Sequence, residues 1–544
     1  MKPGFERSVT VIGGGLAGLC AARAIRLSSG GRVAVTLVES STRFGGWLHS
    51  ERVGGQLYER GCRGIRPSGE SGARVLSLIE SLGLTELATA SSPSAAVRYI
   101  QYKDQLEAVP RSLVEALRSP LTRGAPLWAL KDLFAAPAAR EESVAAFVER
   151  HFGAHAARVL LDAALGGIYA GDIDQLSAKS VLGAVHAAEQ KGQWGSYASV
   201  LLGLLRSSRQ QQQQQQQPPP SPFVRELSQA SSVSFVDGLS TLVLALQRSL
   251  QQDPGVELLL GSRATDLRED ASVRVLSQGS SSSGASSSRV VQADCVVLAL
   301  PAPALSALLS THSALAEAAG AAGEVPMASV GVVGLGWTHR PGAPGASPHP
   351  ALPHAGFGYL VPQLSRPPAW RSAGGPSTPP LLGMTWDSEV FPGQEEGWAG
   401  RVRSGSVRGL LAPASAAETR VTVMMGGARH SSGEYEEGAM VAAALAAARH
   451  SSVRVGVGAP PTVQFVTVAR AAIPQYTVGH AERLRRVEAG LASVLGAGRA
   501  ELVGNSWRGV GAADTAAGAL AAGTRLGLGL LKCRPGPIPS GAGL

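Results

Sequence analysis

The chain has 544 residues, of which 44% are hydrophobic, so it is long enough for several domains with large cores. Its formal charge of +9 comes from 49 basic and 40 acidic residues that are scattered rather than clustered, which argues against a nucleic-acid partner. Diffuse positive charge fits an anionic ligand or an anionic membrane surface equally well. The four cysteines have neither CxxC nor Cys/His ligand spacing, so no disulfide framework and no metal site are expected.

The first elements predict a parallel βαβ unit that binds a dinucleotide. A buried strand at 9–12 leads into a glycine loop and a helix, and a second strand at 33–38 ends on Glu39. Glycines in this order permit a tight turn, close approach of a pyrophosphate and close helix packing, while the helix N-terminus offers free N–H groups. Glu39 would accept hydrogen bonds from an adenosine ribose, and this pattern leaves NAD and FAD both open. The phosphate loop consists of Gly13, Gly14, Gly15, Leu16, Ala17 and Gly18.

No apolar run approaches the roughly 18 residues that a membrane span requires, so no integral helix is expected. Residues 1–7 are too short for a signal peptide, and the strand that follows belongs to the fold. We therefore expect no cleavable presequence.

The segment from Arg98 to about Leu205 is dominated by helix-forming sequence, after a helix around 75–82. Two helices are expected at 110–118 and 126–134, each with a proline near its start, where the missing N–H is harmless. Their apolar faces mix with Trp, Lys and Arg. Such a face either packs on the main body or rests on a membrane.

The middle of the chain alternates low-complexity and ordered stretches. A polyglutamine run at 210–217, followed by three prolines, predicts a disordered insertion. A short strand is expected at 256–260, a second low-complexity patch lies at 280–288, and a buried strand at 293–300 stops at a proline. We therefore expect the nucleotide-binding sheet to be assembled from distant segments.

The last third predicts an antiparallel sheet followed by a return to the nucleotide unit. Strand-like runs, separated by loops at 340–353, 366–380 and 393–416 that need not be ordered, occur at 329–335, 356–362, 381–386 and 420–427. The final stretch from Glu501 is a strand, a glycine loop and a small-residue helix from Ala516 onward. A second helix N-terminus is expected near the first.

Two sets of motifs carry a family resemblance. Glu39 followed by RFGG at 43–46 resembles the acid-plus-RxGG signature of FAD enzymes in the amine-oxidase superfamily, which narrows the cofactor to FAD. Segments along the whole ordered chain resemble the protoporphyrinogen oxidases of the animal mitochondrial type: VESSTRFGGWLHS, RGCRGIRPSG, GGIYAGDIDQLS, GFGYLVP, RVTVMMGG, IPQYTVGH and WRGVGAAD. Cys62 stands where these enzymes usually have proline, and Gly166 where a basic residue can occur.

The resemblance implies one non-covalent FAD per chain, held by the phosphate loop and Glu39. Arg43 and Trp47 would line the cofactor, Ala264 would lie near the adenine, and two backbone segments would meet the isoalloxazine. These segments are Gly61, Cys62, Arg63 and Gly64, and Val510, Gly511 and Ala512. The alternative is that Arg63 has a structural role, with its positive charge serving its own loop and not the cofactor.

For the substrate, the resemblance implies that Arg98 binds a propionate and Gly167 contacts the macrocycle through its backbone. Phe357, Leu360 and Met424 would clamp it, although Phe357 and Met424 are alternatively ordinary core residues. No residue is assigned as a catalytic acid or base, since the pyrrole nitrogens can lose protons as electrons leave. A charged side chain in the apolar surroundings of Arg98 requires a partner.

The implied activity is the six-electron oxidation of protoporphyrinogen IX to protoporphyrin IX with O₂, giving H₂O₂, in haem biosynthesis. The expected enzyme is a homodimer bound peripherally to the mitochondrial inner membrane on its intermembrane-space side. Another flavoenzyme of the superfamily, an amine or polyamine oxidase or a desaturase, is the alternative, and a membrane scaffold without turnover is a third. Amine oxidases typically use a late lysine near the flavin, and no lysine occurs between Lys191 and Lys532.

The expected fold class is α/β, with a Rossmann-like FAD-binding domain built from discontinuous segments, an antiparallel-sheet substrate domain and a helical membrane-associating domain. The expected FAD-binding parts are 1–92, 233–302 and 486–533; the others are the helical region 93–206, the disordered insertion 207–232, the substrate domain 303–485 and a flexible tail 534–544.

Overall fold

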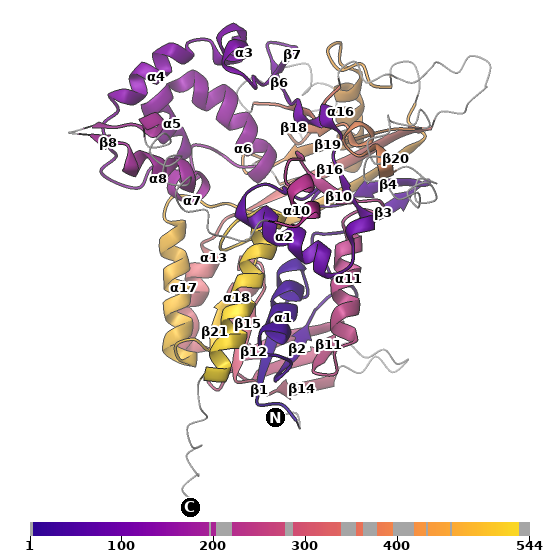
Figure 1. Cartoon of the computed structure of the whole chain (residues 1–544), viewed down its shortest axis with the longest axis vertical. Helices are drawn as coiled ribbons and strands as arrows, with labels where there is room; N and C mark the ends of the chain where they lie inside the picture. Colours follow the sequence, from indigo (N-terminus) through magenta and orange to yellow (C-terminus); the bar gives the residue numbers. More distant parts are fainter. Residues whose placement is uncertain are drawn as a thin grey trace, which may run out of the picture. The chain divides into compact units, whose positions relative to one another are not determined.

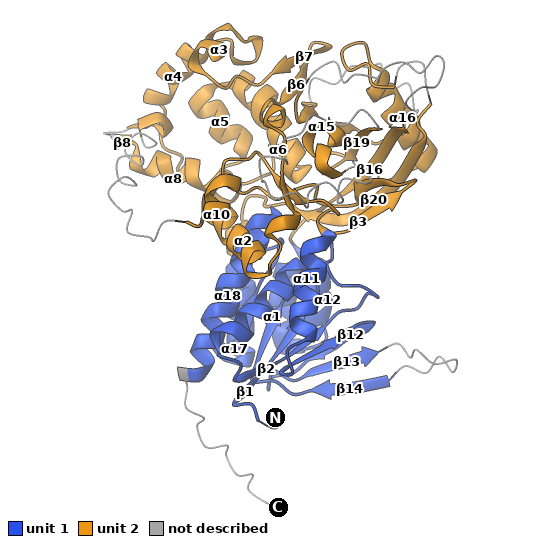
Figure 2. Cartoon of the chain, turned by 45° about the vertical axis from the view of Figure 1, so that its right-hand side comes forward, with its two compact units in different colours: residues 1–48, 240–324, 484–544 blue, residues 49–239, 325–483 orange. Residues whose placement is uncertain are grey.

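The computed structural model describes residues 4–194, 197–202, 220–277, 287–338, 355–362, 378–394, 418–430, 433–456 and 460–532 (Figure 1). The chain divides into two compact units, each made of separate stretches (Figure 2). Unit 1 comprises 1–48, 240–324 and 484–544, and unit 2 comprises 49–239 and 325–483. The expected loops at 340–353 and 366–380, the loop at 393–416, the polyglutamine run and the tail lie wholly or mostly outside the described residues.

Unit 1 is built on a five-stranded parallel sheet with strand order β11-β2-β1-β15-β21. Its strands come from across the chain: β1 (Arg7–Ile12), β2 (Val33–Val38), β11 (Val256–Leu259), β15 (Cys295–Leu298) and β21 (Ala500–Leu502). Every residue of β2 is buried, as expected for a parallel strand covered on both faces. The expectation of a sheet assembled from distant segments is confirmed.

Helices cover this sheet, and an antiparallel three-stranded sheet accompanies it. The helices are α1 (Leu16–Ser28), α11 (Ser240–Gln251), α12 (Ala302–Leu309), α13 (Ala316–Gly323), most of α17 (His480–Leu495) and α18 (Ala512–Lys532). The smaller sheet contains β12 (Ser262–Leu267), β13 (Val273–Ser277) and β14 (Ser287–Val291).

Helix α18 packs directly on α1 because glycines face it. A Cβ on Gly523 would lie 2.6 Å from the Ala21 carbonyl oxygen, and one on Gly527 would lie 2.9 Å from that of Ile25. The contacts advance along both helices in the same order, so the helices are parallel and their N-termini lie at the same end. This is the second helix N-terminus expected from the sequence.

Unit 2 contains a seven-stranded sheet with order β20-β16-β19-β18-β17-β6-β7. The strands are β20 (Val463–Pro474), β16 (Met327–Thr338), β19 (Glu418–Gly426), β18 (Leu381–Thr385), β17 (Gly358–Leu360), β6 (Tyr99–Tyr102) and β7 (Gln105–Ala108). All neighbours are antiparallel except β17 and β6, which are parallel. The predicted antiparallel strands are therefore present, within a mixed sheet.

The hairpin β6–β7 corrects the expectation that the chain is helical from Arg98 onward. Its two-residue turn is Lys103 and Asp104, whose φ angles are +49° and +61°. Turns with two positive φ values match the twist of a hairpin but usually contain asparagine or glycine. Because this turn contains neither asparagine nor glycine, the sequence gives no strong signal for it.

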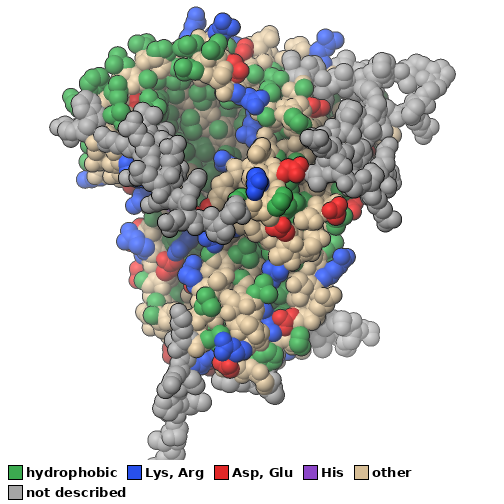
Figure 3. Space-filling view, in the orientation of Figure 1, with side chains coloured by type: hydrophobic (Ala, Val, Ile, Leu, Met, Phe, Trp, Pro, Cys, Tyr) green, Lys and Arg blue, Asp and Glu red, His purple; other side chains and the backbone are tan. Residues whose placement is uncertain are grey.

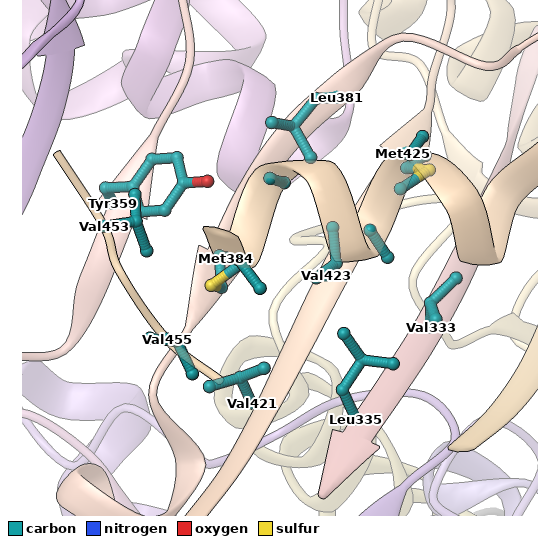
Figure 4. Close-up of a cluster of buried hydrophobic side chains, with 14 of the residues drawn as sticks. Val333, Leu335, Tyr359, Leu381, Met384, Val421, Val423, Met425, Val453 and Val455 are labelled. Carbon is teal, nitrogen blue, oxygen red and sulfur yellow. The ribbon is translucent and has the colours of Figure 1, made fainter. Parts of the chain in front are cut away.

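One face of this sheet forms a large apolar core. Side chains of β16, β18 and β19 pack beneath α16 (Glu437–Arg449), together with the stretch around Val453 and Val455 (Figure 4). The Tyr359 ring from β17 and the Trp386 indole belong to the same cluster and are almost fully buried. This core fixes the strands that carry the candidate substrate residues.

The remainder of unit 2 is mainly helical. Its helices are α2 (Gly69–Ser81), α3 (Leu113–Arg118), α4 (Ala125–Leu133), α5 (Val144–Phe152), α6 (Asp162–Tyr169), α7 (Ala178–Val181), α8 (Gly183–Lys191), α10 (Pro222–Leu227) and α15 (Asp387–Val390). Short strands pair as β3 (Ser50–Val53) with β4 (Gln56–Glu59), β5 (Ala88–Ala90) with β10 (Val233–Phe235), and β8 (Gln193–Trp194) with β9 (Tyr197–Ala198). Within the described residues, no helix combines the length and the apolar character needed to cross a bilayer.

Several domain boundaries differ from those expected. Residues 303–324, which were expected in the substrate domain, belong to unit 1 with α12 and α13. Residues 49–92 belong to unit 2, because Tyr58 packs edge-on against Phe465 and Ile65 forms a bridge with Val233. The end of the insertion expected at 207–232 is ordered, because α10 buries Val224 and Leu227. Contacts between distant segments set these boundaries.

Candidate active site

The candidate residues fall into two groups, one in each unit. In unit 1 the glycine loop between β1 and α1 has no space for side chains at three positions. A Cβ on Gly13 would lie 2.4 Å from the Ala299 carbonyl oxygen, one on Gly14 would lie 2.5 Å from the Phe44 ring, and one on Gly18 would lie 1.9 Å from the Gly13 carbonyl oxygen. Around Gly15, the nearest atom would be 3.9 Å away. The loop thus exposes backbone at the N-terminus of α1, where an anion is favoured.

The RFGG segment closes over this loop. The Gly45 amide donates to the Gly14 carbonyl oxygen at 2.9 Å, and Gly45 and Gly46 have φ angles of +108° and +57°. Arg43 donates through Nη2 to the Gly46 carbonyl oxygen at 2.7 Å, which fixes the turn. Arg43 therefore shapes the loop, while the indole of Trp47 is 41% exposed.

Glu39 lies at the end of β2, as predicted, and ties the loop together. Its carboxylate accepts hydrogen bonds from the Gly14 and Ser41 amides, both at 2.7 Å. The backbone of Glu39 also pairs with Leu259 and Ser262, which brings the start of β12 and its Ala264 to the same edge.

The candidate segment at 510–512 forms the N-terminus of α18. This helix begins at Ala512, four residues before the expected start, and the Thr515 amide donates to the Gly511 carbonyl oxygen at 2.9 Å. The preceding Gly509 has a φ of +98°, and a Cβ there would lie 2.4 Å from Asp514. The backbone around Val510 is therefore held in one turn at the start of α18.

In unit 2 the segment 61–64 contains the guanidinium of Arg63, whose buried nitrogen donors are not all hydrogen-bonded within the described residues. Arg63 donates through Nη1 to the Gly61 carbonyl oxygen at 2.9 Å, whereas its buried Nε and Nη2 have no hydrogen-bond partner among the described residues. Burial lowers the pKa of Arg63, an effect opposed by Asp387, Cys62 and Glu59. Cys62 donates to the Gly64 carbonyl oxygen at 3.0 Å, and burial raises the pKa of its thiol. Unused buried donors require an acceptor, which a ligand can supply.

Glu59 is a buried carboxyl group that the sequence analysis missed. It accepts hydrogen bonds from the Leu239 amide at 2.7 Å and from the Ser50 hydroxyl at 2.9 Å. Burial raises its pKa to about 7, although these hydrogen bonds and the Arg63 charge oppose the shift. The signal available was its position two residues before Gly61, at the end of a strand.

Arg98 and Phe357 are brought together by the pairing of β6 with β17. The Arg98 guanidinium lies 5.3 Å from the centroid of the Phe357 ring, within cation–π range, and the Phe357 amide donates to the Val97 carbonyl oxygen at 2.8 Å. Desolvation and the like charge of Arg66 lower the pKa of Arg98. Among the described residues, the Arg98 side chain has no acidic partner.

Leu360 and Met424 lie in one cross-strand row, separated by Gly383. Leu360 pairs with Gly383 on β18, and Gly383 pairs with Met424 on β19. A Cβ on Gly383 would lie 2.5 Å from the Tyr359 carbonyl oxygen and 3.1 Å from the Leu360 side chain, so this position of the row has no space for a side chain. Gly383 was missed, although a glycine inside a strand signals close approach of another group.

Gly167 meets this row from α6. A Cβ on Gly167 would lie 2.6 Å from a terminal methyl of Leu360, so the Leu360 side chain would have to shift to admit it. Leu360 also packs with Ile100 and Val159, and Met424 packs with Val332. The structure thus brings together Gly167, Leu360 and Met424, and separately Arg98 and Phe357.

Comparison with known proteins identifies the class. The model of the family described as flavin containing amine oxidoreductase matches residues 16–405. A solved structure from an Exiguobacterium species aligns with a TM-score of 0.67 at 20% identity, covering 96% of this chain and 99% of its own, and shares the fold. The chain is therefore a flavin-dependent oxidoreductase of this family.

The curated relatives narrow the family further. Protoporphyrinogen oxidase from Bos taurus is 32% identical over 491 residues, covering 88% of this chain and 90% of its own. The Homo sapiens enzyme is 32% identical over 489 residues with the same coverage. The chain belongs to the protoporphyrinogen oxidases of the animal type, which confirms the resemblance seen in the sequence.

The residues present fit a flavin. The open backbone beside Gly15 suits a pyrophosphate, and the unused donors of Arg63 suit the carbonyl and ring nitrogen acceptors of an isoalloxazine. Among the described residues, no cluster of histidine, cysteine and acidic side chains could hold a metal ion.

Proposed function

We propose that this chain oxidises protoporphyrinogen IX to protoporphyrin IX, using one non-covalent FAD and O₂. The observation that carries the proposal is the apolar row of Leu360, Gly383 and Met424, which Gly167 contacts from α6. The same unit contains Arg98, which has no acidic partner among the described residues. An apolar macrocycle with propionate groups matches an apolar site that has one cationic anchor.

The family resemblance assigns the cofactor residues: the phosphate loop at Gly13 would bind the pyrophosphate, and the segment at Arg63 would meet the isoalloxazine. When bound, FAD supplies the redox chemistry: three rounds of two-electron removal from the porphyrinogen, with O₂ reduced to H₂O₂ in each. Arg98 would bind a propionate, and Gly167 and Leu360 would orient the macrocycle. No side chain is required as a catalytic acid or base.

The test is to purify the protein, record its flavin spectrum, and follow porphyrin fluorescence after adding protoporphyrinogen IX. Bound FAD together with a fluorescence rise well above autoxidation supports the proposal. Bound FAD without such a rise contradicts it. Coproporphyrinogen in a parallel assay compares the two substrates.

An amine or polyamine oxidase is the alternative within the family. These enzymes typically place a lysine from the later part of the chain near the flavin, and no lysine occurs here between Lys191 and Lys532. We therefore expect no turnover of simple amines in a peroxide assay.

Arg98→Ala should weaken porphyrinogen binding by about 1–3 kcal/mol, the value of a charge-assisted hydrogen bond. The FAD content should stay near that of wild type. The Arg98 guanidinium contacts the Phe357 ring and makes no hydrogen bond to the 61–64 segment. The measurements are KM and the flavin-to-protein ratio. The matched control is Arg74→Ala, whose guanidinium pairs with the exposed Glu70 on α2. Equal loss of FAD and substrate affinity would mean that Arg98 is structural.

We also propose that α3 and α4 attach the protein to a membrane surface. Helix α3 buries none of its residues, and Leu113, Leu117, Leu127, Leu130 and Phe134 are 54–79% exposed. Hydrophobic side chains gather there around a hollow lined largely by such groups (Figure 3). An exposed apolar helix face with flanking basic residues is typical of interfacial helices.

Replacing both Leu117 and Leu127 with glutamate should therefore weaken binding to anionic liposomes by tenfold or more, since each buried leucine contributes roughly 1.5–3 kcal/mol. Co-sedimentation measures the change. The matched control replaces Leu244 and Leu528, which are 47% and 48% exposed in unit 1. Equal losses in both double variants would contradict the proposal.

The remaining parts of the proposal rest on the animal relatives. We infer a homodimer bound peripherally to the mitochondrial inner membrane on its intermembrane-space side. Fractionation of mitochondria followed by carbonate extraction tests the placement, and light scattering of the purified holoenzyme tests the oligomeric state.

A further inference from the structure

Helix α6, which carries Gly167, is intrinsically weak. It has eight residues, two of which are the adjacent glycines Gly166 and Gly167, and a π-helical segment precedes it at 156–161. A glycine inside a helix lowers stability by roughly 1 kcal/mol relative to alanine. The helix therefore depends on contacts from outside for its position.

The C-terminal end of α6 is held by two distant segments. The Tyr169 carbonyl oxygen accepts a hydrogen bond from the Gln475 side chain at 2.8 Å, and the Ala170 carbonyl oxygen accepts one from the Ala428 amide at 2.7 Å. Gly427 allows this approach, since a Cβ there would lie 2.5 Å from the Ala170 oxygen. The turn after β19 is thus fastened to the end of α6.

The next residue of that turn, Arg429, also contacts the other end of the helix. Its Nη1 lies 3.3 Å from Oδ1 of Asp162, the first residue of α6, as an ion pair without hydrogen-bond geometry. Its Nη2 lies 2.5 Å from Asp172 and 3.1 Å from Asp174, in the loop that follows α6. One guanidinium therefore binds the start of the helix and the loop beyond its end.

Burial makes this arrangement sensitive to charge. Asp162 is fully buried and Arg429 is 19% exposed. Removing one member of a buried ion pair takes away part of the compensation of the other charge, which destabilises more than removing both. Because α6 contacts β17 and β18, a shift of the helix would move Gly167 away from Leu360.

We propose that Arg429 is a positioning residue for the porphyrin site: it holds α6 so that Gly167 stays against Leu360. Arg429 lies in the turn after β19, the strand that supplies Met424, so the same segment carries one wall of the site and fixes another. This inference rests on the proposed function.

The test compares holoenzyme variants with wild type. Arg429→Gln should raise the KM for protoporphyrinogen IX about tenfold, change kcat less than twofold and leave FAD content unchanged. Hydrogen exchange of the amides at 162–170 should accelerate about tenfold or more in the same variant, a readout that requires no substrate. Arg429→Lys, which keeps the charge, should recover part of both losses.

Two further variants separate charge from folding. Asp162→Asn combined with Arg429→Gln removes both members of the pair and should bring exchange back toward wild type. Arg158→Gln is the matched control, because Arg158 belongs to the same network but binds Asp174 at 2.7 Å and Glu149 at 2.9 Å. It should leave KM and exchange of α6 unchanged.

An unchanged KM and unchanged exchange in Arg429→Gln would overturn the proposal, as would equal effects in Arg158→Gln. Loss of folded holoenzyme in Arg429→Gln that the double variant does not restore would also overturn it. Absence of porphyrinogen turnover in wild type would refute the proposed function instead, whereas the exchange comparison would still decide whether Arg429 positions α6.

Discussion

Gly18→Ala should yield a protein that no longer retains flavin through purification. The added methyl group would lie 1.9 Å from the Gly13 carbonyl oxygen, and because this oxygen belongs to the backbone, no side chain can move to relieve the contact. Overpacking of this kind costs roughly 1–3 kcal/mol or more and would open the loop that receives the pyrophosphate. Absorbance of the purified protein gives the flavin content, and fluorescence titration with FAD gives the change in Kd.

The matched control is Gly518→Ala in α18, a helix of the same unit. No atom lies within 4 Å of a Cβ at that position, and alanine favours a helix by roughly 1 kcal/mol. This variant should keep its flavin and unfold at the same or a slightly higher temperature. Wild-type flavin retention in Gly18→Ala would show that the loop is not the phosphate site.

Asp132→Asn should destabilise the helical part of unit 2 by about 3 kcal/mol. The fully buried Asp132 carboxylate accepts hydrogen bonds from His151 at 2.7 Å, from the Ser199 hydroxyl at 2.5 Å, and from the Val200 and Leu201 amides at 3.0 Å. In asparagine, one of the two accepting oxygens is replaced by an NH₂ group. This donor would face the donors that now bind that oxygen. Urea unfolding of the holoenzyme measures the loss.

The same cluster predicts how stability depends on pH. Burial alone would lower the pKa of His151, but its hydrogen bonds to Asp132 and Glu189 outweigh burial and raise it. Burial alone would raise the pKa values of Asp132 and Glu189, but their hydrogen bonds outweigh burial and lower these pKa values. A raised histidine pKa gives stability that is lost as pH rises through it, and a lowered carboxyl pKa gives stability that is lost as pH falls through it. The contribution should therefore be greatest between about pH 4 and 6.5, the usual values of these groups.

The control for this prediction is Asp104→Asn in the turn between β6 and β7. Its φ of +61° suits asparagine, so stability and its pH dependence should stay as in wild type. Asp132→Asn should instead flatten the decline on the alkaline side, because His151 loses its strongest acceptor. An unchanged alkaline limb would show that His151 stays neutral.

Local patterns explain which features could be predicted from the sequence. The loop at Gly13 and the acid at Glu39 were identified because β1, the glycines and β2 occur within one short stretch, where each residue has a defined role. The pairing of Arg98 with Phe357 was expected only through the family resemblance. Nothing in the segment around either residue specifies that β6 lies beside β17.

Other features depend on contacts between distant residues and have no local signal. The row of Leu360, Gly383 and Met424 depends on the register of three strands. His151 lies 19 residues from Asp132 and 38 from Glu189, so their hydrogen bonds arise from helix packing alone. The hairpin at 99–108 was missed because its turn residues are a lysine and an aspartate.

The sheet of unit 1 has a consequence for the order of events during synthesis. Strand β1 is made first, but its sheet is complete only when β21 has been added, and α1 is covered only when α18 follows. At the ribosome's usual speed of roughly 5–20 residues per second, this interval is on the order of half a minute or more. During it the edge of β15 that pairs with β21 and the side of α1 that α18 covers remain exposed while the rest of unit 2 is produced. Loading of the cofactor must therefore wait for the end of translation, and a nascent chain truncated before residue 500 should be recognised by chaperones and proteases as unfinished.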